Sequence, residues 1–202
     1  MLPLILLVAA LATPPIPIAV IDREPTHHLV LENAALKVYD VRLPPGGESY
    51  FHAHPTPHAV VVISPARLKN EVRGKEPVDQ FTGEAGKYLF LPAGPEHRQK
   101  NVDQTPARWL ALELKGDPQA ADIATQHLTL NPGQTATLPY DKDFLGIAIT
   151  NARLEVSPGQ KGKRVEVNLA AGTPTWYAKG AGMSLKNVGN GVVEMVFVKR
   201  RD

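Results

Sequence analysis

Turn residues and strand patterns recur along this chain at a separation of 86 residues, and this repetition constrains the fold more than any other feature. The coinciding pairs include Gly47 with Gly133, Arg67 with Arg153, Gly86 with Gly172, Gly94 with Gly180 and Asn101 with Asn187. A series of matches at one offset is typical of two copies of one structural unit. The sequence therefore predicts two similar halves of roughly 85 residues each.

Within each half, short apolar segments alternate with turn residues. The chain contains 16 glycines and 19 prolines, more than a helical bundle tolerates. Clusters of them at 44–47, 92–95 and 131–133 separate segments that have the alternating pattern of strands. We therefore predict an all-β fold. One exception is residues 118–127, where Asp117 and Pro118 favour a short helix that links the two halves.

Composition excludes several classes of function. The formal net charge is +2 and no long basic segment occurs, so nucleic acid is not an expected partner. Cysteine is absent, which excludes disulfides, thiolate metal sites and cysteine nucleophiles. The sequence shows no Ser-His-Asp signature, no glycine-rich phosphate loop and no paired carboxylates.

The first residues resemble a targeting segment. Residues 2–12 are almost wholly apolar but too short to span a bilayer as a helix. Ala10-Leu11-Ala12 fits a signal-peptide cleavage site, although no Lys or Arg precedes the apolar segment. We predict a signal peptide over 1–12, cleavage near Ala12 and a periplasmic or secreted protein with no stable membrane span. The alternative is an N-terminal strand or membrane-associating segment that is retained.

Four histidines are candidate metal ligands. His52 and His54 are two residues apart, so on a strand their imidazoles share one face. His58 follows after Pro55 and Pro57, which can turn the chain back, and His97 follows a second turn. Imidazole suits zinc, iron, nickel and copper, and manganese less often. The remaining histidines carry no such expectation: His27 and His28 form an ordinary pair and His127 is predicted to be solvated.

The histidines lie in two motifs that resemble those of the cupin superfamily. In the first motif Gly46, His52 and His54 stand at the expected spacing, while His58 replaces a glutamate and Pro65 a glycine. The second motif matches at every position, namely Gly86, Pro92, Gly94, His97 and Asn101. The resemblance covers roughly residues 28–115, and it implies a double-stranded β-helix, a jelly-roll-like barrel. Carried over residue by residue, it implies that His52, His54, His58 and His97 bind one divalent metal.

The second half resembles a degenerate copy of the first. Leu138, Tyr140, Phe144 and Met183 stand opposite the four histidines at the 86-residue offset. We therefore predict two tandem cupin barrels: a metal-binding barrel at 28–115, a linker at 116–127 and a metal-free barrel at 128–202. The second barrel is expected to be structural or, alternatively, to bind an apolar ligand. Homodimerisation is left open.

The resemblance implies several functions without choosing among them. Cupins with histidine ligands include dioxygenase-like enzymes, and other cupins are isomerases, decarboxylases, storage proteins or sugar-binding regulators. Our first hypothesis is a metal-dependent, dioxygenase-like oxidoreductase that uses iron, manganese, zinc, nickel or copper on a small organic substrate. The second is a non-catalytic module that binds an anion or sugar acid. The third is a structural protein with a vestigial metal site.

Two further residues are candidates for catalysis. Tyr50 has even spacing with His52 and His54, and Gln99 has even spacing with His97, so both are expected to point into the barrel. Each could then hydrogen-bond a substrate. The alternative is that Tyr50 packs in the barrel core and Gln99 hydrogen-bonds a histidine ligand from outside the metal site.

Overall fold

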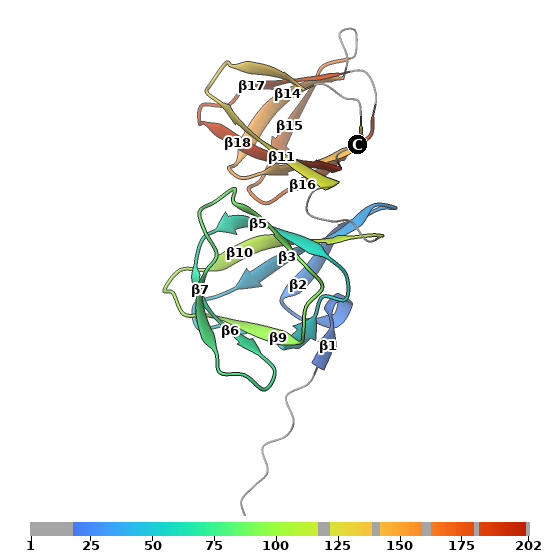
Figure 1. Cartoon of the computed structure of the whole chain (residues 1–202). Coiled ribbons are helices and arrows are strands. Elements are labelled where there is room, and N and C mark those ends of the chain that lie inside the picture. Colours follow the sequence, from blue (N-terminus) through green and yellow to red (C-terminus); the bar gives the residue numbers. More distant parts are fainter. Residues whose placement is uncertain (1–17, 117–121, 139–141, 159–162, 180–181, 201–202) are drawn as a thin grey trace, which may run out of the picture.

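A computed structural model describes residues 18–116, 122–138, 142–158, 163–179 and 182–200 (Figure 1). The predicted signal peptide, residues 1–12, lies outside these ranges. The described residues form 18 β-strands and one short 3-10 helix, η1 (Ile21–Arg23), which confirms the all-β prediction. None of the described segments forms a helix that is long and apolar enough to cross a bilayer.

The N-terminal half forms two five-stranded sheets. In spatial order, one contains β1 (Ile18–Val20), β4 (Phe51–Ala53), β9 (His97–Asn101), β6 (Arg67–Val72) and β7 (Val78–Phe81). The other contains β2 (His27–Glu32), β3 (Leu36–Leu43), β10 (Ala107–Leu114), β5 (His58–Ser64) and β8 (Tyr88–Leu91).

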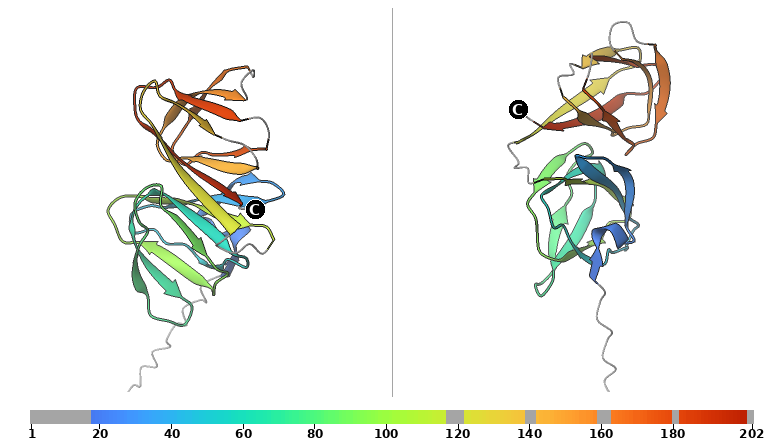
Figure 2. Two further views of the ribbon diagram at one scale, coloured as in Figure 1. Left: turned by 45° about the horizontal axis from the view of Figure 1, so that its top comes forward. Right: turned by 90° about the vertical axis from the view of Figure 1, so that its right-hand side faces the viewer.

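The C-terminal half forms two four-stranded sheets. One contains β11 (Ile123–Leu130), β18 (Val193–Arg200), β13 (Phe144–Ala148) and β16 (Pro174–Tyr177). The other contains β12 (Thr135–Leu138), β17 (Met183–Asn187), β14 (Ala152–Pro158) and β15 (Val165–Leu169). Two pairs of sheets thus form two tandem barrels, as predicted, and Figures 1 and 2 show one barrel beside the other.

The internal repeat extends to individual hydrogen bonds. Asn101 and Asn187 are both fully buried, and each donates two hydrogen bonds from Nδ2 to backbone carbonyls and accepts one at Oδ1. The backbone N–H of Gly46 donates to the carbonyl of Asn101, and that of Gly133 donates to Asn187. Both glycines have positive φ, 73° and 80°. Gly46, rather than Gly47, is therefore the equivalent of Gly133, and the offset is one residue longer at this turn.

The predicted helix over 118–127 is wrong where the structure describes it. Strand β11 begins at Ile123 and pairs with β18 along its whole length, as far as Leu130. The N-capping pattern of Asp117 and Pro118 is overridden because pairing buries Ile123 and Leu130. Residues 118–121 lie outside the described ranges. His127 lies on β11 with its side chain exposed.

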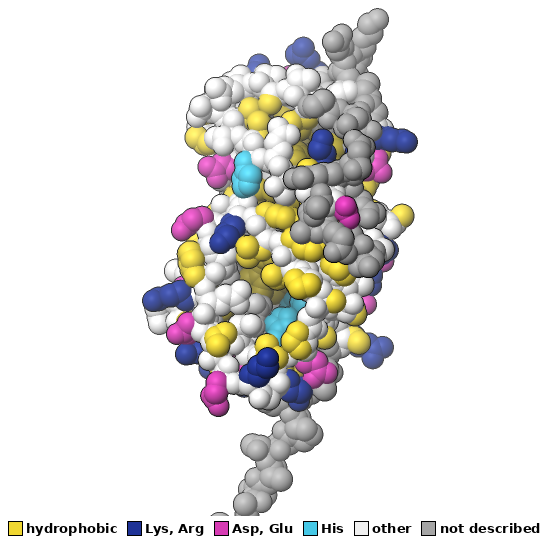
Figure 3. Space-filling view, viewed as in Figure 1, with side chains coloured by type: hydrophobic (Ala, Val, Ile, Leu, Met, Phe, Trp, Pro, Cys, Tyr) yellow, Lys and Arg dark blue, Asp and Glu magenta, His cyan; other side chains and the backbone are white. Residues whose placement is uncertain are grey.

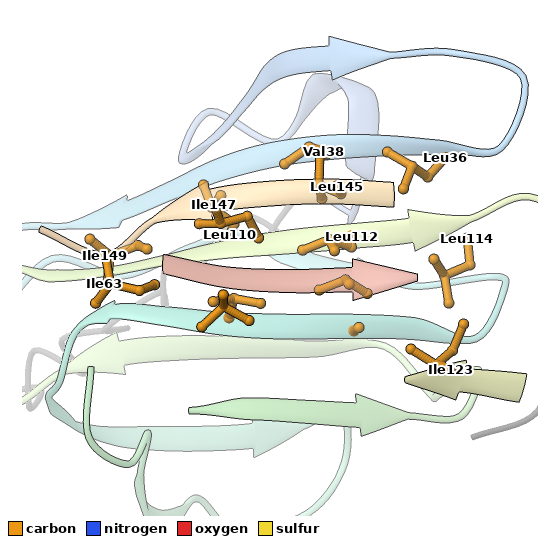
Figure 4. Packing of buried hydrophobic residues seen from close by; sticks show 14 residues of the cluster. Leu36, Val38, Ile63, Leu110, Leu112, Leu114, Ile123, Leu145, Ile147 and Ile149 are labelled. Carbon is orange, nitrogen blue, oxygen red and sulfur yellow. The ribbon is translucent and has the colours of Figure 1, made fainter. Parts of the chain in front are cut away.

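The two barrels share a hydrophobic core between them. Apolar side chains from β3, β5 and β10 pack against others from β11, β13 and β18, and Figure 4 shows them lying between the two sheets. The buried members include Val38, Leu110, Leu112, Leu145, Ile147 and Val196. Burial of this apolar surface stabilises the contact between the two barrels.

A polar bridge lies beside this apolar interface. Arg108 of β10 donates to both carboxylate oxygens of Asp40 and, from Nη1, to the carbonyl of Ala171 in the other barrel at 2.7 Å. The next residue is Gly172, where φ is +78° and an added Cβ would lie 2.5 Å from Nη2 of Arg108. Glycine at this position therefore allows the guanidinium to approach the second barrel.

Candidate metal centre

Strand pairing brings three of the four predicted histidines together. His52 on β4 lies directly opposite His97 on β9, and their ring centroids are 4.7 Å apart. His54 follows β4, and its ring lies 5.2 Å from that of His52 and 5.4 Å from that of His97. His52 and His54 are buried. The spacing in the sequence therefore leads to a shared site inside the N-terminal barrel.

His58 lies in the same cluster but in a different relation to its neighbours. It begins β5, and its ring stacks on that of His54 with centroids 3.9 Å apart and planes 12° apart. Its Nδ1 is buried and has no hydrogen-bond partner among the described residues. The ligand atoms of His54, His58 and Glu113 lie within 4.8 Å of one another.

The expectation that His27 is an ordinary surface histidine is wrong. His27 begins β2, and its side chain is buried with the ring 4.6 Å from that of His52 and 6.1 Å from that of His54. The register of β2 against β3 places it opposite Val41, a residue of the barrel core. His28, the next residue, is exposed as expected. No local pattern marks His27, because its place in the barrel depends on a pairing between strands.

Four of these histidines have Nδ1 bound to an oxygen outside the cluster. Nδ1 of His27 lies 2.6 Å from Glu24 Oε2, and Nδ1 of His52 lies 2.9 Å from the carbonyl of Tyr50. Nδ1 of His54 contacts Glu113 Oε1, and Nδ1 of His97 lies 3.3 Å from the carbonyl of Pro95. Since these oxygens accept, the proton is assigned to Nδ1, and Nε2 keeps a lone pair for a metal.

Burial keeps the imidazoles of His52, His54, His58 and His97 neutral. It lowers the pKa of His52 and of His54 to about 3, and that of His58 to about 4, and neighbouring imidazoles add to the effect. Burial also lowers the pKa of His97. Because metals bind the unprotonated ring, these groups are ready to coordinate an ion at neutral pH without first losing a proton.

Two buried carboxylates that the sequence analysis missed support the cluster. Burial raises the pKa of Glu113, which contacts His54 and accepts a hydrogen bond from Thr56 Oγ1 at 3.0 Å. Burial would also raise the pKa of Glu24, but hydrogen bonds from His27, Thr26 and the Tyr50 N–H outweigh it and lower that pKa to about 2. Glu24 is therefore an anion beside the cluster at neutral pH.

A cavity of about 260 Å³ opens beside the histidines. His27, His54, His58 and His97 contribute to its wall, and Figure 3 shows a hollow in the N-terminal barrel with histidine side chains visible inside it. The polar residues elsewhere in the wall are Asn70, Gln80, Thr82 and Gln99. Among the described residues that line the cavity there is no Lys, Arg, Asp or Glu. It is therefore an apolar and amide-lined space with imidazoles at one side.

The structure separates the two catalytic candidates. Gln99 lines the cavity, as its spacing from His97 predicts. Tyr50 is 46% exposed and does not line it, so the inward orientation expected for Tyr50 is wrong. Glu48 pairs with Lys100 whereas His52 pairs with His97, so the segment 48–52 holds one residue more than the strand opposite. This β-bulge breaks the alternation of side chains between Glu48 and His52.

The second barrel has an apolar interior where the first has histidines. Leu138, Phe144 and Met183 are buried in one hydrophobic cluster with residues of β14, β17 and β18. Tyr140, the fourth predicted replacement, lies outside the described residues. Apolar side chains thus replace the imidazoles in the described part of this barrel, and a cavity of about 160 Å³ opens beside Leu138, Phe144 and Phe197.

Comparison with known proteins agrees with this architecture. Residues 39–113 match the family model of the cupin domain, whereas no curated protein matches the sequence significantly. AerE from Microcystis aeruginosa has a similar structure, with 12% identity and a TM-score of 0.61 over 89% of this chain and 99% of its own. Oxalate decarboxylase from Bacillus subtilis, a protein with Mn(II) centres, has 13% identity and a TM-score of 0.59 over 88% of this chain and 76% of its own.

The family match and the structural likeness cover different parts of the chain. The family model covers the motifs and their histidines, and the structural likeness extends over both barrels. At 12–13% identity the latter concerns the fold alone. Residues 39–113 in the N-terminal half thus match the cupin domain, and the chain as a whole has a two-barrel fold similar to that of these two proteins.

Proposed function

We propose that the N-terminal barrel binds one divalent transition-metal ion and acts on a small organic substrate as a metal-dependent, dioxygenase-like oxidoreductase. One observation carries the proposal: the outward hydrogen bonds at Nδ1 direct several Nε2 atoms into one space. Nε2 of His52 is fully buried there and has no hydrogen-bond partner among the described residues. A buried polar atom without a partner is unfavourable, and a metal ion would satisfy it.

Three ligands of the proposed site are the same whichever residue takes the fourth position: His52, His54 and His97. They come from the two motifs, and their Nδ1 atoms all have outward acceptors. His58, which the motif predicts as the fourth ligand, and His27 are the two candidates for the remaining position. Iron, manganese or copper bound here would supply redox chemistry at one side of the cavity, and zinc or nickel would polarise a bound group.

The protein's own residues would orient the substrate and exclude water. Val60, Leu89 and Trp109 give the cavity apolar walls. Gln99 and Asn70 offer amide groups, and Oδ1 of Asn70 is buried with no hydrogen-bond partner among the described residues. A substrate hydroxyl or N–H could donate to it. The chemistry of the wall therefore favours a compact, partly apolar molecule that carries an oxygen able to bind the metal.

The same wall argues against a small dianion as the preferred substrate. The structurally similar protein from Bacillus subtilis is an oxalate decarboxylase, but here no cationic side chain lines the described cavity. A dicarboxylate would have only the ion to neutralise it, and desolvating the second carboxylate would be costly. We therefore propose a neutral or singly charged substrate.

Elemental analysis of the full chain, purified without chelator or added metal, is the first test. The proposal predicts about one iron, manganese, nickel or copper per chain, and oxygen uptake with a subset of small diketones and organic acids. The variant His97→Ala should lose metal and activity but keep the β-sheet circular dichroism. A wild-type protein that binds no transition metal even after reconstitution would refute the proposal.

A binding module is the second candidate. One feature favours it: no carboxylate lines the described cavity, so an acid–base pair for proton transfer is lacking there. In this case small anions or sugar acids would perturb the spectrum of the bound metal without being consumed. Measuring both ligand-induced spectral change and turnover on the same sample separates the two candidates.

A further inference from the structure

We infer that His27 is a ligand of this metal centre and that Glu24 positions it, so that a segment outside both motifs completes the site. The inference rests on the proposed metal-binding function. It concerns which imidazole takes the fourth position, for which His27 and His58 are the candidates.

Ring orientation favours His27. A metal bound to imidazole lies in the plane of the ring, so two ligands of one ion need planes that meet at the ion. The planes of His27 and His52 are inclined at 64°, and the ligand atoms of His27, His52 and His54 lie within 4.8 Å of one another. These three side chains therefore already surround one space with their donors.

The orientation of His58 is unfavourable for the same ion. Its ring faces that of His54 at 3.9 Å, and the two planes are nearly parallel. Two imidazoles stacked face to face cannot both contain one ion in their planes. His58 is placed to support the ring of His54 by stacking rather than to bind the metal.

Glu24 links His27 to the rest of the site. Its Oε2 accepts from Nδ1 of His27 at 2.6 Å, and its Oε1 accepts from the backbone N–H of Tyr50 at 2.9 Å. The carbonyl of Tyr50 in turn accepts from Nδ1 of His52. One buried carboxylate thus orients His27 directly and His52 through the backbone of one residue, Tyr50. Such supporting groups fix which nitrogen of a ligand faces the metal.

The backbone around Glu24 is also built to hold this position. Strand β1 pairs in parallel with β4 and places Ala19 opposite His52. The 3-10 helix η1 follows, with Ile21 buried in the core of the barrel, and Glu24 and His27 come next. The segment is therefore attached to the strand that carries His52 and to the core, not only through His27.

Titration of the metal-free full chain with Co²⁺, followed by visible absorption, tests the inference. Removing a ligand should weaken affinity and change the absorption of bound Co²⁺, because the intensity depends on the number and geometry of the ligands. We expect His27→Gly to lower affinity at least a hundredfold and to alter the spectrum. Added imidazole should restore the spectrum, since His27 lines the cavity and its site is accessible. His28→Gly, a change at the adjacent exposed residue, should behave as wild type.

Two more variants separate ligation from structural support. Glu24→Gln should lower affinity by about 10–100-fold, the range for groups that orient a ligand, and should shift the Co²⁺ spectrum. His58→Ala should lower affinity by less than tenfold and keep the wild-type spectrum. If wild type binds Co²⁺ but His27→Gly keeps its affinity and spectrum, the inference is overturned while the metal centre stands. If wild type binds none, the proposed function itself fails.

Discussion

The two barrels of this chain have the same framework and opposite interiors. In both, a fully buried asparagine, Asn101 or Asn187, makes the same three hydrogen bonds to the turns around it. Inside, His52, His58 and His97 of the first barrel correspond to Leu138, Phe144 and Met183 of the second. The comparison shows that the framework does not require the histidines. The chemistry of the site is carried by side chains that can change while the strands and turns persist.

The difference extends to the cavity. Val60, Leu91 and Ala111 line it in the first barrel, and the equivalent residues at the 86-residue offset are Gly146, Tyr177 and Phe197. A Cβ at Gly146 would lie 2.8 Å from the ring of Tyr177 and 2.9 Å from that of Phe197. Two aromatic rings therefore pack against Gly146, at the position where the first barrel has Val60 in the cavity wall.

The largest expected effect comes from giving the first barrel a residue of the second. His52→Leu copies Leu138 and removes a central imidazole, so bound metal should fall from about one per chain to almost none while the circular dichroism is unchanged. Elemental analysis measures this. As the reciprocal control, Leu138→Ala should leave the metal content as in wild type. If His52→Leu retained its metal, His52 would not be a ligand, and the contrast between the interiors of the two barrels would not explain where metal binds.

The next largest effect is expected in the apolar barrel. Phe197 is buried and packs edge-on against Phe144 at a centroid distance of 5.6 Å. Phe197→Ala should destabilise the protein by about 3–5 kcal/mol, because the loss of apolar burial is followed by a cavity. Urea denaturation of the two proteins gives the difference in unfolding free energy. A loss of unfolding free energy below about 1 kcal/mol would mean that Phe197 is not tightly packed, contrary to the contrast with the open cavity of the first barrel.

Removing the buried asparagine should lower the unfolding free energy by a similar amount in either half. Asn101→Ala and Asn187→Ala each leave two carbonyls and one N–H without their partner, at a cost of about 1–3 kcal/mol for a buried group. We expect similar losses of unfolding free energy for the two variants by chemical denaturation. A large loss in one and none in the other would break the equivalence of the two barrels at the position where they match most closely.

The smallest expected effect concerns the junction and depends on pH. Burial would raise the pKa of Asp40, but hydrogen bonds from Arg108 and Arg42 outweigh it and hold the pKa below its usual 3.8. Its ionised form therefore stabilises the fold fully above about pH 4, and this contribution is lost as pH falls through the lowered pKa. The difference in unfolding free energy between wild type and Asp40→Asn should shrink on acidification. A difference that is independent of pH would exclude this role.

Part of the site follows from the sequence because strand geometry is simple. The two-residue spacing of His52 and His54 places them on one side of a strand, and the glycine and proline pattern before His97 identifies the second strand. The 86-residue repeat likewise identifies the second barrel and its apolar interior. These features depend on local pattern, which the sequence contains.

Other parts depend on contacts that the local pattern does not contain. The pairing register of β2 with β3 places His27 beside the other histidines, and the carboxylate of Glu24 accepts a hydrogen bond from its ring. Tyr50 points outward because one extra residue interrupts the alternation before His52. Strand β11 forms where Asp117 and Pro118 favour a helix, because β18 offers a partner for its whole length. In each case a tertiary pairing outweighs a local preference.

The aromatic filling of the second barrel also affects how its sequence can evolve. To regain a metal site, it would need several histidines at once and the loss of the rings of Phe144 and Phe197. Any one histidine introduced alone would be a buried polar group without a partner in an apolar core, which costs stability. Each intermediate with a single histidine would thus be less stable than both the present apolar barrel and a barrel with a complete metal site. Single substitutions therefore do not readily convert this apolar interior into a metal centre.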